Sequence, residues 1–146
     1  MPATGPDISR RALLLASLAV SARAADPAQE VWDVITTMAA ALSRSDAGEF
    51  LSVCDPAMPR YAALRANVLA LVAQVEAESG IDPVRNIGDE RVRDVEVDWS
   101  LHLVDKTSLL GITRRRDILK CRMEKRGRKW KVVALEPIAL FAPLSA

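Results

Sequence analysis

The chain has 146 residues, of which half are hydrophobic and 27 % are charged, and its formal net charge is +1. This composition is typical of one globular domain with a modest core. A net charge so close to zero gives no basic surplus for binding nucleic acid or anionic lipid. The sequence contains no internal repeat and no low-complexity tract.

The first 24 residues predict a signal peptide. Arg10-Arg11 precedes a short apolar run, Ala12–Val20, and Ala22-Arg23-Ala24 is a small-residue cleavage pattern. The run is too short for a transmembrane anchor. Ser9–Leu14 resembles a twin-arginine export signal, and a general secretory signal that happens to hold two arginines is the alternative. The mature domain is then 25–146, in the periplasm or secreted.

Three helices are predicted next. Asp26-Pro27 is a helix start, and Asp46-Ala47-Gly48-Glu49 has the pattern of a capping box that opens a short second helix. Two prolines at 56 and 59 end that helix. A third helix of about 17 residues begins near Tyr61. The apolar positions at helical spacing are, in the first helix, Val31, Ile35, Met38 and Leu42 and, in the third, Leu64, Val68, Leu71, Val72 and Val75.

Alternating apolar and charged residues predict three long antiparallel strands, Arg91–Val104, Ile112–Lys125 and Trp130–Phe141. One register satisfies both faces of the first two strands, because it pairs apolar with apolar and acid with base. The predicted pairs are Val97–Leu119, Val95–Cys121, Glu96–Lys120 and Asp94–Arg122. A turn at Gly127 would add Val133 beside Cys121 and Leu135 beside Leu119, with Lys131 on the same face.

The segment from Glu76 to Asp89 is harder to interpret. Ser79-Gly80 and Asp82-Pro83 argue against a helix, and Ile81, Val84 and Ile87 are compatible with a short or edge strand, where proline is tolerated.

Three helices followed by a curved antiparallel sheet resemble the NTF2-like superfamily, also described as SnoaL-like or cone-shaped. The resemblance covers about Pro27 to Pro143 and rests on three stretches: Asp46–Asp55, Asp94–Leu103 with Asp98-Trp99, and the closing hairpin with Trp130-Lys131-Val132. It implies an α+β fold with helices packed on the sheet, and together with the predicted signal peptide it favours an exported bacterial member of the superfamily. The superfamily includes isomerase-like and dehydratase-like enzymes as well as proteins that only bind, so the fold does not select a function.

The resemblance implies a pocket on the concave face of the sheet. The expected lining is Trp32, Phe50, Tyr61, Trp99, Leu101, Arg115 and Asp117. Asp117 is predicted to point inward, opposite Trp99 and near Tyr61. A carboxylate in such a partly dry pocket would have a raised pKa and could act as a general acid or base. The alternative is that Arg115 and Asp117 lie at the rim, paired with each other or with solvent.

Other candidate groups have simpler interpretations. Asp98 and His102 alternate onto the polar face opposite Arg114 and Arg116, as a cross-strand charge ladder would. The sequence has a single histidine, which is too few ligands for a histidine-based zinc site. It contains no phosphate-binding loop or other cofactor motif. Cys54 and Cys121 form a disulfide or remain two separate buried thiols.

These observations favour a non-catalytic domain that binds a small apolar ligand or a protein partner. The alternative is a SnoaL/ketosteroid-isomerase-like enzyme that uses Asp117 with Tyr61 or Trp99 nearby. A homodimer through the outer face of the sheet is a further expectation, and it would bury Glu96, Lys120 and Ala134 across a two-fold axis.

Overall fold

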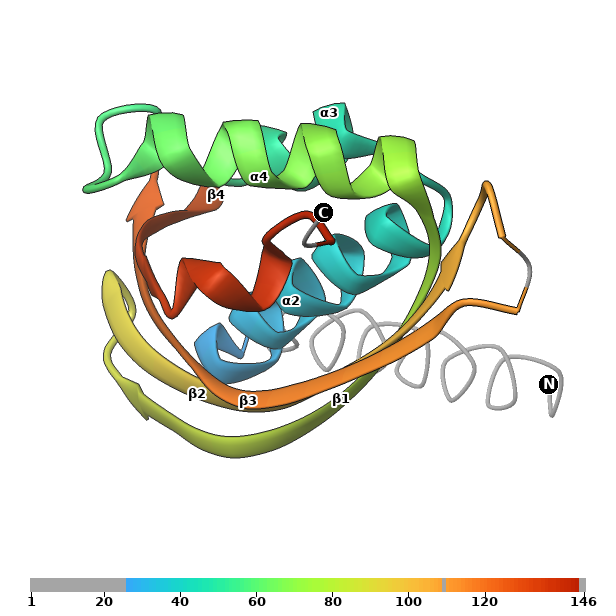
Figure 1. The fold of residues 1–146 in the computed structure, drawn as a ribbon. Helices are drawn as coiled ribbons and strands as arrows, with labels where there is room; N and C mark the ends of the chain where they lie inside the picture. The colour runs from blue at the N-terminus through green and yellow to red at the C-terminus, as the bar shows by residue number, and fades with distance from the viewer. Residues whose placement is uncertain (1–25, 109, 145–146) are drawn as a thin grey trace, which may run out of the picture.

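The computed structural model describes residues 26–108 and 110–144, so the predicted signal peptide lies outside the described residues. Three helices come first: α2 (Pro27–Ser43), α3 (Ala47–Ser52) and α4 (Tyr61–Gln74). Figure 1 shows them on the concave side of a strongly curved sheet. This arrangement confirms the predicted α+β fold.

The sheet consists of four antiparallel strands in the order of the chain, β1-β2-β3-β4. Their bounds are β1 Val75–Gly88, β2 Val92–Asp105, β3 Ile112–Arg126 and β4 Lys129–Glu136, and a 3-10 helix, η1 (Ile138–Phe141), follows. β4 pairs only with the Lys120–Arg126 half of β3. The other half of β3, from Ile112 to Leu119, has a neighbouring strand on one side only.

The helix starts follow the predicted capping. The Asp26 carboxylate accepts a hydrogen bond from the Ala28 N–H, and the Asp46 carboxylate accepts one from the Glu49 N–H. Each bond satisfies a backbone donor that has no partner inside the helix. α4 begins at Tyr61 as predicted but has 14 residues rather than about 17, because Val75 is already the first residue of β1.

The predicted pairing of the first two long strands is confirmed. Val97 lies opposite Leu119 and Val95 opposite Cys121, while Glu96 lies opposite Lys120 and Asp94 opposite Arg122. Alternation on both strands fixes this register, since a slip of one residue would turn every charged side chain toward the core.

The prediction of a third strand over Trp130–Phe141 is wrong in its length and register. β4 stops at Glu136, because Pro137 has no N–H for a strand ladder, and the chain continues as η1. A β-bulge lies where Arg122 pairs with Ala134 but Met123 pairs with Val132. The bulge brings Val132 into the core, and it places Leu135 opposite Cys121 instead of Leu119.

The uncertain segment before β2 is a 14-residue edge strand, longer than the short strand considered from the sequence. Its register against β2 shifts between Pro83 and Arg85. A bulge on an edge strand is a position where proline is tolerated, because the missing N–H interrupts no central ladder.

The core lies between the helices and the concave face of the sheet, and every buried residue described is hydrophobic. α2 contributes the predicted stripe of Val31, Ile35, Met38 and Leu42, and β2 contributes every second residue from Val95 to Leu103. Over the described part of the chain, each helix is too short or too polar to span a bilayer.

Candidate functional site

The concave interior is filled by the protein's own side chains. The Phe141 ring from η1 packs edge-on against Phe50, with ring centroids 5.1 Å apart, and edge-on against Trp99 at 5.2 Å. All three side chains are fully buried. The Trp99 indole N–H donates to Ser79 Oγ at 3.2 Å, so its polar group is also satisfied internally.

The predicted pocket residues are therefore mostly core residues. Phe50, Trp99 and Leu101 are fully or almost fully buried, and Trp32 and Tyr61 are partly buried and pack against the same cluster. Phe141 was missed as a member of this group because the sequence pattern assigned it to a strand. Pro137 was the available signal that the strand ends before it.

Asp117 is exposed, which differs from the inward placement that strand alternation predicts. It pairs with Trp99 in the register, as expected, but it lies beyond the end of β4, where no further strand covers this part of β3. Its carboxylate accepts a hydrogen bond from the Ile118 N–H at 2.8 Å. No hydrogen bond or ion pair joins it to Tyr61 among the described residues.

Arg115 is half-buried and binds the end of the chain. Its guanidinium donates to the carbonyl oxygens of Leu140 at 3.1 Å and Pro143 at 3.3 Å, and also to that of Ala142. Burial lowers the pKa of the Arg115 guanidinium. Arg115 thus acts as a clamp that holds the backbone of residues 140–143. It forms no ion pair with Asp117, which was one of the two partners expected at the rim.

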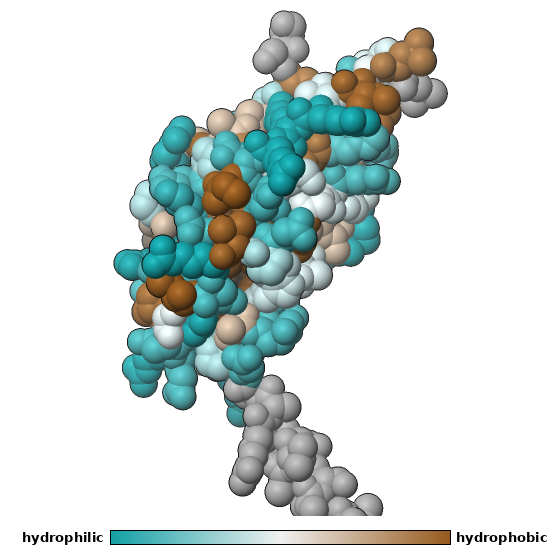
Figure 2. Space-filling model, turned by 90° about the horizontal axis from the view of Figure 1, so that it is seen from below, coloured by the Kyte–Doolittle hydropathy of each residue, from teal (hydrophilic) through white to brown (hydrophobic). Residues whose placement is uncertain are grey.

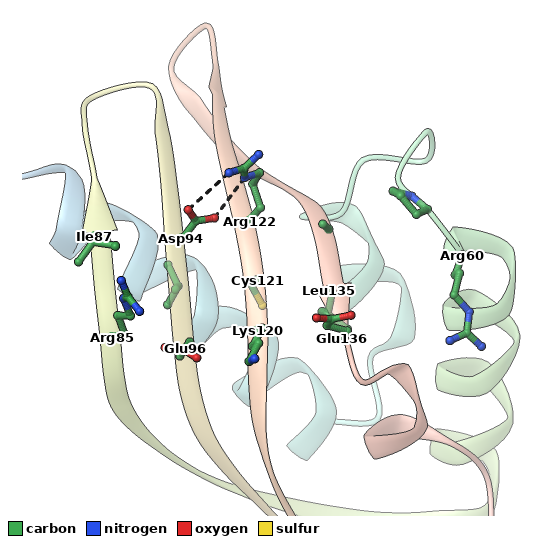
Figure 3. Close-up of a pocket in the computed structure, with 13 residues that line it drawn as sticks. Arg60, Arg85, Ile87, Asp94, Glu96, Lys120, Cys121, Arg122, Leu135 and Glu136 are labelled. Atoms are coloured by element: carbon green, nitrogen blue, oxygen red, sulfur yellow. Dashed lines mark hydrogen bonds and ion pairs between the residues drawn. The ribbon is translucent and has the colours of Figure 1, made fainter.

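The outer face of the sheet carries a groove of about 540 Å³. Figure 2 shows this face, seen from below, as mostly hydrophilic with a few isolated hydrophobic spots. The groove extends over all four strands, and the loop residues Pro59 and Arg60 at the start of α4 also line it. Figure 3 shows the charged side chains of the strands on the side of the sheet away from the helices, and Arg60 beside α4.

Two cross-strand rows line this groove. The charged row consists of Arg85, Glu96, Lys120 and Glu136, in neighbouring positions on β1, β2, β3 and β4. The mixed row, next to it, consists of Ile87, Asp94, Arg122 and Ala134. Sequence reasoning placed the β2, β3 and β4 members on the outer face, and the register of β1 was needed to add Arg85 and Ile87.

The two rows differ in how their charges are used. In the mixed row, Arg122 Nε donates to Asp94 Oδ1 at 3.1 Å, and this hydrogen bond raises the pKa of Arg122. In the charged row, none of the four side chains makes a hydrogen bond or ion pair with another described residue. Its four charges, alternating in sign across the sheet, remain available for a partner.

The remaining candidates take structural roles. Arg116 binds Asp98 through two hydrogen bonds, at 2.9 and 2.6 Å, and this bonding lowers the pKa of Asp98. The pair belongs to the predicted charge ladder, with His102 opposite Arg114. Cys54 and Cys121 are free thiols, both buried. The described residues contain no group of three or more His, Cys, Asp or Glu side chains that could hold a metal ion.

Comparison with known proteins identifies the fold. No family model matches the sequence, and no curated protein does. Among solved structures, an NTF2-like superfamily protein from Salmonella enterica superposes with a TM-score of 0.65 at 13 % identity, covering 82 % of this chain and 93 % of that one. The chain has the NTF2-like fold.

Two further solved structures with similar folds are also distant in sequence. A ketosteroid isomerase-like protein from Erwinia carotovora has a TM-score of 0.62 at 11 % identity, covering 75 % of this chain and 93 % of its own. A conserved protein from Planctomyces limnophilus has a TM-score of 0.60 at 10 % identity, covering 73 % of this chain and 91 % of its own. Identities this low relate the folds and carry no activity from one protein to another.

Proposed function

We propose that this chain is a non-catalytic binding domain that holds a protein partner on the outer face of its sheet, and that the partner is a second copy. The observation that carries this proposal is the charged row, whose four side chains are unpaired within the groove. The filled interior favours a protein partner over a small apolar ligand, because Phe141 occupies the space between Phe50 and Trp99.

The order of charges in this row is self-complementary. Place two sheets face to face, with a two-fold axis parallel to the strands and midway between β2 and β3. The operation lays β2 of one copy on β3 of the other, and β1 on β4. Glu96 of each copy then meets Lys120 of the other, and Arg85 meets Glu136. Every charge in the row faces its opposite, as an isologous interface requires.

The mixed row obeys the same symmetry. Under the same operation Asp94 meets Arg122 of the second copy, and Ile87 meets Ala134. Ile87 is 46 % exposed, so the contact would remove apolar surface from water. A two-fold axis perpendicular to the strands would instead lay β2 on β2, acid against acid. Charge complementarity therefore selects one of the two orientations.

The isomerase-like alternative has less support. It requires a carboxylate in an enclosed, partly dry pocket, where burial would raise its pKa. Asp117 is exposed, and its carboxylate accepts the Ile118 N–H. Nothing in the described geometry places a second acid or base beside it.

Two charge-altered proteins test the proposal. In the first, Arg85→Glu with Lys120→Glu makes the row entirely acidic. In the second, Glu96→Lys with Glu136→Lys makes it entirely basic. Sedimentation equilibrium of the wild type should give a dimer, each altered protein alone should be monomeric at the same concentration, and an equimolar mixture should give a heterodimer. Arg65→Glu with Arg128→Glu is the matched control, because both arginines are exposed and lie outside the groove.

The outcome is decisive in both directions. A monomeric wild type, or altered proteins that dimerise as well as the wild type, would refute the second copy as partner. In the proposed orientation, the all-acidic protein and the all-basic protein have the best charge complementarity. If each of them dimerised with the wild type but the two did not dimerise with each other, this orientation would be refuted.

A further inference from the structure

We infer that the opposite end of the outer face binds a small molecule that carries a tetrahedral oxyanion, such as a phosphate or sulfate ester. A second groove of about 550 Å³ lies there, lined by residues of β1, β2 and β3. A volume of this size is typical of small-molecule sites. Its polar lining includes Ser100, His102, Arg114 and Arg116, and Glu78 is its single acid.

Arg114 supplies the free positive charge of this groove. It is exposed and makes no hydrogen bond or ion pair with any residue in 26–108 or 110–144, and the register places it directly opposite His102. An arginine presents five N–H donors in a planar fork, which suits the oxygen atoms of a phosphate or sulfate. The exposed part of the His102 side chain, 40 % of its surface, borders the same groove.

Arg116 contributes a second guanidinium that is held in position. It binds Asp98 through Nε and Nη2, at 2.9 and 2.6 Å. These two hydrogen bonds use two of its five N–H groups and leave Nη1 free for a ligand. Asp98 does not line the groove, so its carboxylate fixes the guanidinium without occupying the space beside Arg114.

Gly80 and Ser100 form the floor between these groups. The two residues pair across β1 and β2 on the outer face, and Ser100 Oγ is 3.4 Å from the Gly80 carbonyl oxygen, a weak hydrogen bond that a ligand oxygen could replace. A Cβ at position 80 would lie 2.6 Å from Ser100 Oγ. Glycine therefore keeps the hydroxyl accessible from the groove.

The site is built from other residues than the groove of the proposed dimer. His102 lies six positions after Glu96 of the charged row along β2, which is about 20 Å at the rise of an extended strand. The two grooves share no lining residue. Substitutions in one groove therefore change no lining residue of the other, so failure of one proposal can be told from failure of the other.

Binding is tested by titrating the full mature chain with inorganic phosphate and with sulfate, each against chloride at matched ionic strength. Calorimetry should show saturable binding, and the amide resonances of Gly80, Ser100 and Arg114 should shift most. Arg114→Gln should weaken binding at least five-fold and Ser100→Ala about two- to three-fold, while Glu78→Gln should strengthen it by removing the acid. The control Arg128→Gln, at an exposed hairpin tip, should bind as the wild type does.

Phosphate and sulfate binding together establish an oxyanion site, and a preference for one of them names the class of ester. Two results would overturn the inference. One is that phosphate and sulfate give no more heat and no larger amide shifts than chloride does at the same ionic strength. The other is saturable binding that Arg114→Gln leaves unchanged. Thermal unfolding of each variant shows whether it is folded, and the exposed position of Arg114 makes loss of folding there unexpected.

Discussion

Phe141 packs edge-on against Trp99, with ring centroids 5.2 Å apart and ring planes at 85°. The contact joins the 3-10 helix after the last strand to the middle of β2, and the same Phe141 ring touches Phe50 of α3. One side chain near the C-terminus thus connects a helix and the sheet at the centre of the concave face. Phe141 of η1 therefore fills the space between α3 and the concave face of the sheet.

Replacing this ring should destabilise the domain strongly. Phe141→Ala removes a fully buried aromatic side chain and leaves a cavity, which costs about 3–5 kcal/mol of unfolding free energy. Urea denaturation followed by tryptophan fluorescence measures the change. Leu110→Ala is the control, since that side chain is 93 % exposed and should alter stability by less than about 0.5 kcal/mol. A loss no larger than the control's would show that the interior does not depend on this contact.

Arg115 should hold the C-terminal segment in place. Arg115→Gln removes a charged donor from the carbonyl groups of Leu140, Ala142 and Pro143, and we expect a loss of about 1–3 kcal/mol. Hydrogen exchange should accelerate in residues 138–144 before it accelerates in β2. Arg114→Gln is the neighbouring control, because its guanidinium has no described partner. Equal exchange in both variants would contradict the clamp.

The sequence predicted the β2–β3 pairing because both faces of both strands are patterned. Apolar partners on one face and opposite charges on the other, as in Glu96 with Lys120, leave a single acceptable register. β4 carries a bulge, and the alternation of apolar and polar residues along the sequence does not reveal where a strand has one extra residue. Alternation placed Ala134 and Glu136 on the outer face, but the bulge moves Val132 from that face into the core, and this change required the structure.

Asp117 shows a different limit of sequence reasoning. Alternation places a residue on a face of a sheet but does not say whether anything covers that face. β4 ends opposite Lys120, and Asp117 is three residues farther along β3, beyond the paired region. The predicted pocket residues Phe50 and Trp99 were correctly placed inside, yet the residue that fills the space between them lies in a segment assigned to a strand.

The predicted export signal remains a prediction, and it can be tested directly. Arg10→Lys with Arg11→Lys keeps both charges but removes the planar guanidinium groups, so a twin-arginine receptor should no longer recognise the signal. Immunoblots of periplasmic and cytoplasmic fractions should then show the protein retained in the cytoplasm. Arg23→Lys is the control. Unchanged export would favour the general secretory alternative, and a cytoplasmic wild type would contradict export altogether.

The two cysteines should be unreactive in the folded protein. Burial raises the pKa of the Cys54 thiol to about 12, and burial also raises the pKa of Cys121. The thiolate is the reactive form, so at neutral pH a disulfide reagent should label neither thiol until the domain unfolds. Labelling should therefore accelerate with urea in parallel with global unfolding. Rapid labelling of the folded protein, or fewer than two thiols after full denaturation, would contradict two buried free thiols.

The same pKa values predict how stability changes at high pH. A thiol whose pKa is higher in the folded than in the unfolded state loses its proton at a lower pH when the chain is unfolded. Rising pH therefore favours the unfolded state. The two buried thiols therefore contribute fully below about pH 9, their unperturbed value, and that contribution falls as the pH rises toward 12. Cys54→Ala should show a shallower loss of unfolding free energy between pH 9 and pH 11 than the wild type, measured by urea denaturation. Parallel curves for the two proteins would show that Cys54 does not titrate on unfolding.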